Sequence, residues 1–169
     1  MLFTGEYEHT IDAKLRLAMP SEIRSRIDPE RQGAAFYLAP GPNGAIWIWP
    51  DRTFEQMAGA MAQSLLPDED LLDFEEYLFP NSHRVELDKA GRIRLPERML
   101  KEAAIESSVV ILGVKDHLEL RDPARWTEQR REKLARQHEI MLRARQALSH
   151  ASRTDGAAGR TDQRDKEPS

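Results

Sequence analysis

Hydrophobic and polar residues alternate over residues 3–11, where Tyr7 and Ile11 belong to the apolar face. A period of two residues is typical of a β-strand that buries one face. Two pairs of short apolar runs follow later in the chain, within residues 36–49 and 109–120, and each pair is separated by a glycine-containing turn signal. The pattern therefore predicts a protein rich in short strands.

Three stretches have helical rather than strand character. Residues 51–66 place apolar side chains at helical spacing until Pro67 ends the run, and residues 68–79 form a shorter, acidic candidate helix. The pair Asp122-Pro123 is a favourable helix start, so we expect a long helix from there to about residue 149. Residues 151–169 contain no Val, Ile, Leu, Met or aromatic residue, which predicts a disordered tail.

A nine-residue frame occurs twice, as 12–20 and as 88–96. In both copies an apolar residue precedes an Asp, an Arg follows that Asp by four positions, and a Pro follows it by eight. The flanks match as well, giving strand, basic loop, strand, short helix, strand, turn, strand and helix in each copy. Such a repetition indicates an internal duplication and an α+β fold. The expected halves are residues 1–79 and 80–150.

The centre of each frame reads as a tight turn. Asp12 and Asp88 can initiate it, because an Asp side chain accepts hydrogen bonds from backbone N–H groups two residues on. Gly91 can adopt a positive φ at no steric cost. The first copy has Leu15 at that place, so the same shape there would cost about 1–2 kcal/mol.

The loops also concentrate positive charge. The candidate DNA-contacting residues are Lys14 and Arg16 in the first copy and Lys89, Arg92 and Arg94 in the second. Arginine on a rigid β-loop suits phosphate contact, and its planar fork also reads guanine in the major groove. A solvent-exposed charged turn without a ligand explains one such loop equally well, but two equivalent loops favour a repeated partner such as a DNA backbone.

Composition narrows the class of protein. The chain has 169 residues, a net charge of −4 and no cysteine, which excludes disulfides, thiol catalysis and thiolate metal sites. Six carboxylates lie between residues 68 and 76, so the negative charge is local and leaves room for a basic site elsewhere. Neither a membrane span nor a signal peptide is expected.

On these residues the chain resembles the MraZ family, transcriptional regulators built from two AbrB-like halves. The resemblance rests on Asp12-Ala13-Lys14-Leu15-Arg16 with Pro20, and on Asp88-Lys89-Ala90-Gly91-Arg92 with Pro96, and covers roughly residues 1–145. It implies a β-rich fold of the double-psi or swapped-hairpin type, with the halves related by a pseudo-twofold axis. Leu15 in place of the loop glycine and Ala90 in place of the loop lysine depart from the family pattern.

The resemblance further implies what the protein does. It implies ring-shaped homo-oligomers that bind short direct repeats in double-stranded DNA upstream of the division and cell-wall gene cluster, and that repress this cluster including the protein's own gene. It places the protein in the cytoplasm, associated with the nucleoid. No cofactor, metal or small-molecule substrate is expected.

Two other functional classes are compatible with the sequence. The first is a ring-forming interaction protein or an antitoxin-like partner whose loops no longer grip DNA. The second is an enzyme, for which His9 and His83 are conceivable metal ligands on equivalent strands; no carboxylate stands at ligand spacing beside them, and no phosphate-binding loop or nucleophile motif is present. One apolar stripe along the expected C-terminal helix fits either a solvated helix with one packed side or a subunit contact; it consists of Trp126, Leu134, Met141 and Leu148.

Overall fold

A computed structural model describes residues 1–61 and 68–158 of the chain. These residues divide into two compact parts, Met1–Trp126 and the helical part that begins at Thr127. The first part contains all the strands and both basic loops.

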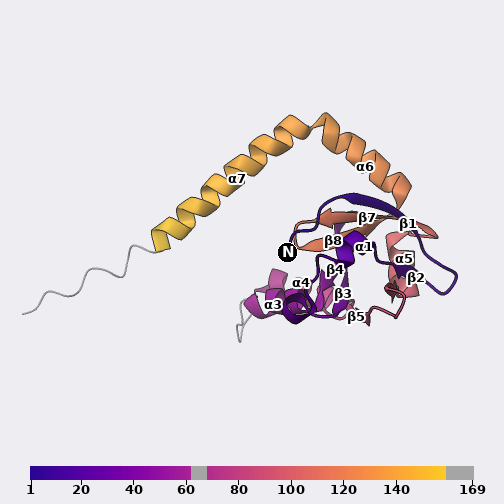
Figure 1. Ribbon diagram of the computed structural model, residues 1–169. Coiled ribbons are helices and arrows are strands. Elements are labelled where there is room, and N and C mark those ends of the chain that lie inside the picture. The colour runs from indigo at the N-terminus through magenta and orange to yellow at the C-terminus, as the bar shows by residue number, and fades with distance from the viewer. Residues whose placement is uncertain (62–67, 159–169) are drawn as a thin grey trace, which may run out of the picture. The chain divides into compact units, whose positions relative to one another are not determined.

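The first part is built on a six-stranded antiparallel sheet (Figure 1). Its order is β1 (Glu6–Thr10), β7 (Ser108–Val114), β8 (His117–Arg121), β4 (Ile46–Pro50), β3 (Ala35–Pro40) and β5 (His83–Glu86). A second, two-stranded antiparallel sheet pairs β2 (Arg16–Ala18) with β6 (Arg92–Arg94). The expected strand-rich α+β fold is confirmed.

The strand order carries the pseudo-twofold symmetry. Exchanging each strand with its counterpart in the other repeat (β1 with β5, β3 with β7, β4 with β8) reverses the order of the large sheet and leaves its pairings unchanged. The same exchange maps the β2–β6 ribbon onto itself. The repeats also trade edge strands, because β1 pairs with β7 and β5 pairs with β3. The duplicated sequence units are therefore interleaved within one body.

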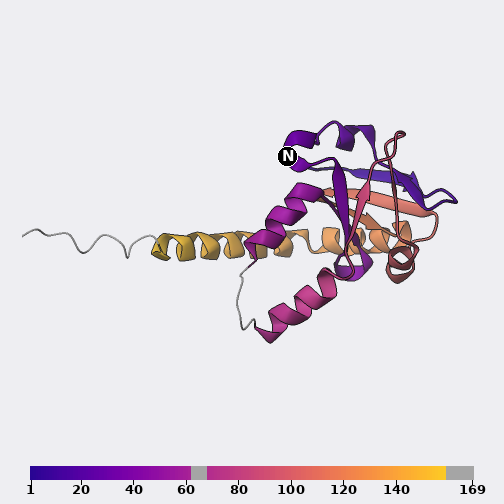
Figure 2. The same cartoon turned by 90° about the horizontal axis from the view of Figure 1, so that it is seen from below.

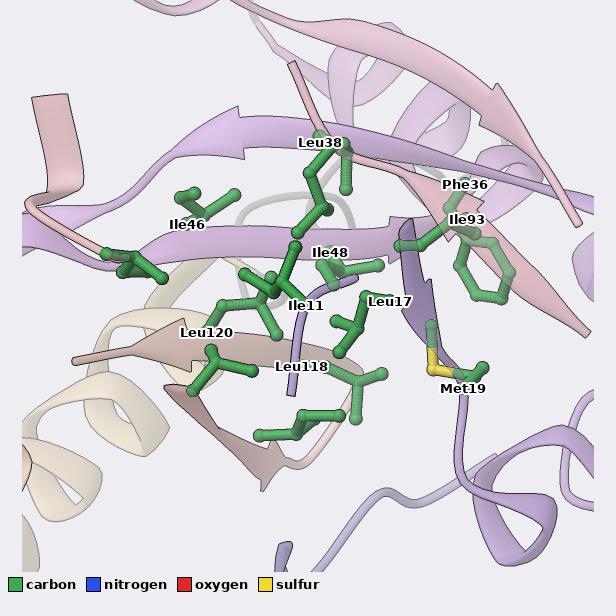
Figure 3. Packing of buried hydrophobic residues seen from close by; sticks show 14 of the residues in the cluster. Ile11, Leu17, Met19, Phe36, Leu38, Ile46, Ile48, Ile93, Leu118 and Leu120 are labelled. Atoms are coloured by element: carbon green, nitrogen blue, oxygen red, sulfur yellow. The ribbon is translucent and has the colours of Figure 1, made fainter. Parts of the chain in front are cut away.

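The main core lies between the large sheet and a cover made by the β2–β6 ribbon and the helices α1 (Ser21–Arg24) and α5 (Glu97–Ala103). Leu17 and Ile93 sit opposite each other in the ribbon and are fully buried. They face Leu38, Ile48 and Leu118 of the sheet (Figure 3). The apolar residues inside each repeated frame thus anchor both basic loops to one core.

The opposite face of the sheet carries a smaller apolar cluster. Helix α3 (Asp51–Ala60) contributes Phe54, helix α4 (Glu69–Leu78) contributes Leu78, and both pack with Trp49 of β4. Figure 2, seen from below, shows the two helices, in purple and magenta, running along roughly the same diagonal. Both elements confirm helices expected from the sequence, although α3 ends at Ala60 and residues 62–66 of its expected span lie outside the described ranges.

Two short helices complete the first repeat, α2 (Pro29–Gln32) and the 3-10 turn η1 (Pro42–Gly44). The long C-terminal helix expected from Asp122 is two helices, α6 (Pro123–Ala135) and α7 (Gln137–Ala158), with a break at Arg136. Because α7 continues to Ala158, residues 151–158 of the expected tail are helical, and residues 159–169 lie outside the described ranges. No helix among the described residues is long and apolar enough to cross a membrane.

The carboxylate of Glu119 in β8 lies among charged and aromatic side chains of β4 and β8. Glu119 accepts hydrogen bonds from Trp47 Nε1 at 3.2 Å and from Arg121 Nε at 2.8 Å. The His117 ring stacks on Trp49, with centroids 4.3 Å apart. Burial raises the pKa of Glu119, but the nearby His117, whose Nε2 lies 3.7 Å from Oε1, the hydrogen bonds from Arg121 and Trp47 and the attraction to Arg121 outweigh it and hold the pKa at about 2. Glu119 is therefore ionised at neutral pH.

We expect Glu119→Gln to reduce stability in a pH-dependent way. A carboxyl whose pKa is lowered by folding stabilises the protein above its unfolded value near 4.5, and this contribution is lost as the pH falls toward 2. The variant should lose about 1–2 kcal/mol at pH 6, after allowance for solvent screening, and match the parent near pH 2. Urea unfolding at several pH values measures the difference. A deficit that is constant with pH would contradict this assignment.

Candidate nucleic-acid interface

The first basic loop is organised by the carboxylate of Asp12. Its Oδ1 accepts hydrogen bonds from the backbone N–H groups of Lys14 at 2.9 Å and Arg16 at 3.0 Å. Its Oδ2 accepts from the Arg16 side chain, through Nε at 2.8 Å and Nη2 at 2.7 Å. Asp12 therefore binds two N–H groups of the turn and also holds the guanidinium of Arg16, one of the candidate DNA-contacting residues.

The second loop repeats this geometry nearly atom for atom. Asp88 Oδ1 accepts from the N–H groups of Ala90 at 2.9 Å and Arg92 at 3.0 Å. Asp88 Oδ2 accepts from Arg92 Nε at 2.8 Å and Nη2 at 2.7 Å. The two arginine side chains are also equally accessible, at 31% and 32%. The duplicated frame thus encodes one loop structure used twice.

The turn closes in the same way in both copies. The N–H of Leu15 donates to Asp12 O at 2.9 Å, and the N–H of Gly91 donates to Asp88 O at 2.8 Å. Both residues are left-handed, with φ of +57° at Leu15 and +73° at Gly91. Leu15 therefore adopts the left-handed conformation that favours glycine, and the strain of about 1–2 kcal/mol applies to it. Its half-buried side chain packs against the main core.

At position 15 we expect the glycine variant to be more stable than the alanine variant, which is the reverse of the usual order. Leu15→Ala keeps the Cβ that disfavours the left-handed conformation and loses the packing, so it should cost about 1–2 kcal/mol. Leu15→Gly loses the same packing but relieves the strain, so its stability should lie within about 1 kcal/mol of the parent. Urea unfolding of the two variants decides the order. If Leu15→Ala were the more stable variant, strain at Leu15 would be negligible.

The ion pairs lower the pKa values of the two loop aspartates. The hydrogen bond from the Arg16 side chain, followed by that from its backbone N–H, lowers the pKa of Asp12 to about 2. The pKa of Asp88 is lowered by the same bonds from Arg92. The bond to Asp88 in turn raises the pKa of Arg92, with a further contribution from the charge of Asp12. The two loops are therefore close enough to interact electrostatically.

The β2–β6 ribbon brings the loops together. Arg16 lies directly across from Arg94, and Arg92 lies across from Ala18, so these four residues share the outer face while Leu17 and Ile93 point into the core. A strand rises about 3.3 Å per residue, so the three-residue ribbon separates the loops by roughly 10 Å, or about three base-pair steps. A two-stranded ribbon of this kind fits the major groove of B-DNA.

The predicted contact residues do not all have the same environment. Lys14, Lys89 and Arg94 are exposed on or beside the ribbon. Arg16 and Arg92 are half-buried, and each engages an Asp through Nε and Nη2, while none of the hydrogen bonds among the described residues uses their Nη1. The sequence analysis did not predict these ion pairs. The signal for them was present, because an Asp and an Arg stand four positions apart across a tight turn in both copies.

The structure gives the histidine alternative no support. His9 lies in β1 and His83 lies in β5, which form opposite edges of the six-stranded sheet. Four strands separate the two histidines in the order of that sheet. Within residues 1–61 and 68–158 there is also no group of three or more His, Asp or Glu side chains placed to hold one.

Comparison with known proteins gives one family. The family model for the MraZ protein, which its description likens to antitoxins, matches residues 2–74 and 78–148. Proteins named "Transcriptional regulator MraZ" are similar over most of the chain. The relative from Mesoplasma florum is 32% identical over 88% of this chain and 99% of its own length, and that from Heliobacterium modesticaldum is 32% identical over 75% and 85%. The relative from Acetivibrio thermocellus is 30% identical over 74% and 84%.

Proposed function

The chain belongs to the MraZ family, and from that membership we propose that it regulates transcription by binding double-stranded DNA through its two basic loops. The relatives are transcriptional regulators by name rather than enzymes, in agreement with the absence of catalytic motifs in the sequence. The proposed target is a set of short direct repeats upstream of the division and cell-wall gene cluster. Occupation of these repeats would repress the cluster, including the protein's own gene, and would place the protein in the cytoplasm with the nucleoid.

The observation that carries the proposal is the ribbon with its two matching loops. Asp12 and Asp88 neutralise much of the charge of Arg16 and Arg92, so the net positive charge comes from Lys14, Lys89 and Arg94. In this arrangement the lysines meet phosphates, while Arg94 and the Nη1 groups of the two loop arginines face the base edges.

A binding titration tests the proposal. A labelled duplex from the region upstream of the protein's own gene should bind with an affinity that falls steeply as salt is raised, because phosphate neutralisation releases counterions. Combined replacement of Lys14, Lys89 and Arg94 by Gln should lower the salt slope by about three units. Arg31→Gln is the matched control, since Arg31 is exposed on α2, which packs beside α3. Undiminished binding by the triple variant would overturn the proposal.

The family description favours one competing function, that of an antitoxin-like partner of another protein. The same titration separates the two. If the protein is folded but its binding to every duplex is undetectable or does not depend on salt, the antitoxin-like function is favoured.

We also propose a homo-oligomer larger than a dimer, closing into a ring. Helix α4 exposes Leu72, Phe74 and Tyr77, and its sequence from 68 to 79 has six carboxylates and no Lys or Arg. Residues 140–149 of α7 expose apolar side chains beside Arg145 and beside Arg143, which forms an ion pair with Glu139, and contain no carboxylate themselves. Apolar faces of opposite charge on different parts of the chain fit a head-to-tail contact between copies, which generates a ring when the rotation closes. Several copies would then present many loops to repeated sites and gain affinity through effective concentration.

Charge reversal tests this contact. Asp70→Lys with Asp73→Lys should dissociate the assembly in sedimentation velocity, and Arg143→Glu with Arg145→Glu on the same chain should restore it. A parent protein that sediments as a monomer at micromolar concentration would refute the assembly. A reversal that leaves the assembly intact would refute this surface.

A further inference from the structure

An arginine outside both loops lies against the second loop. Arg24 is the last residue of α1 and is exposed, and its Nε donates to the carbonyl oxygen of Met19 at 3.2 Å. A Cβ placed on Gly91 would lie 2.8 Å from Arg24 Nη1, 2.9 Å from Cζ and 3.1 Å from Nε. Three atoms of one guanidinium at similar short distances mean that the group lies across the bare Cα of Gly91. The first repeat therefore places a cation on the loop of the second.

The duplication explains why only one loop has this feature. Matching Asp12 with Asp88 makes Leu15 equivalent to Gly91 and Arg24 equivalent to Leu100. Leu100 is buried in the main core, and Leu15 packs against the same core. One leucine from each repeat, Leu15 and Leu100, thus occupies the symmetry-related pair of positions that Gly91 and Arg24 hold at the second loop. The glycine matters here for the space above it as well as for its positive φ, because Leu15 shows that the turn forms without glycine.

The two loops differ in the position of the lysine next to the turn, and Arg24 bears on that difference. The first loop carries Lys14, and the second has Ala90 at the equivalent position. We propose that Arg24 is a phosphate-contacting residue of the second loop and supplies the cation that Ala90 lacks. This inference rests on the proposed DNA binding. It makes the second contact surface a composite of both repeats, because α1 belongs to the first repeat and Gly91 to the second.

A purely structural role for Arg24 would be to hold the end of α1 through Met19 O. Arg24→Gln and Arg24→Lys distinguish the roles, because phosphate contact depends on charge and is read from the salt dependence of binding. Arg24→Gln should weaken binding about three- to tenfold at 0.1 M salt, for all duplex sequences alike, and lower the salt slope by about one unit. Arg24→Lys should retain the slope. Arg31→Gln should change neither quantity.

Gly91→Ala provides an independent test, because its methyl group would occupy the place where the guanidinium rests. It should weaken binding in the parent and have little further effect in the Arg24→Gln background, which is the coupling expected of two residues in contact. If the parent shows no salt-dependent DNA binding, the proposed function itself fails. If the parent binds but Arg24→Gln keeps the full salt slope, only the role of Arg24 is refuted.

Discussion

Gly113→Ala is expected to be among the most destabilising single substitutions in this protein. A Cβ on Gly113 would lie 2.5 Å from the backbone nitrogen of Thr4 and 2.7 Å from its Cα and carbonyl carbon, and backbone atoms cannot move aside as a flexible side chain can. The N-terminal segment is tied to β7 here, through Gly113 N to Gly5 O at 2.9 Å and through paired bonds between Phe3 and Lys115. Displacing it would pull Phe3, which is 1% exposed, out of the main core.

We expect the substitution to cost about 2–4 kcal/mol, as overpacking against backbone does, and to lower the thermal midpoint by about 5–15 °C. Gly59→Ala is the matched control. Gly59 lies inside α3 and a Cβ there meets no atom within 4 Å, so alanine should be neutral or stabilise the protein by up to about 1 kcal/mol. Calorimetry of the two variants gives both values. Similar midpoints for the two would mean that the N-terminal segment is not held as the structure shows.

Asp12→Ala is expected to weaken DNA binding about tenfold or more, even though it removes a negative charge from the proposed contact surface. Charge counting alone would predict tighter binding, because the carboxylate repels phosphate. The structure predicts the opposite, because Asp12 holds two backbone N–H groups and the Arg16 side chain. Charge-assisted hydrogen bonds of this kind contribute about 1.5–3 kcal/mol, so losing them frees the loop and misplaces its cations.

Asp88→Ala should show a loss of similar size, because the second loop has the same bonds. Glu55→Gln, an exposed carboxylate on α3, removes one negative charge without touching a loop and serves as the control. Affinities at one fixed salt concentration decide the matter. Tighter binding by Asp12→Ala would show that net charge, rather than loop order, governs the contact.

The repeated frame made the basic loops, their aspartates and the turn predictable from the sequence. These features depend on local geometry, because Asp12 shapes its turn with groups two to four residues away. Strand character was also predictable, because alternation follows directly from the pleat of a strand. The left-handed turn without glycine could be stated only as a condition, since strain at Leu15 persists only because the core holds its side chain.

Contacts between distant segments needed the tertiary structure. The pairing of β1 with β7 and of β5 with β3 does not follow from alternation, because any antiparallel strand presents the same backbone groups to its neighbour. The break at Arg136 carries no glycine or proline signal in the sequence. The position of Arg24 over Gly91 depends on how α1 packs beside the ribbon. The sequence by itself therefore determined the loop that is used twice, and only the packing of the two repeats into one sheet decided which side chains from elsewhere complete it.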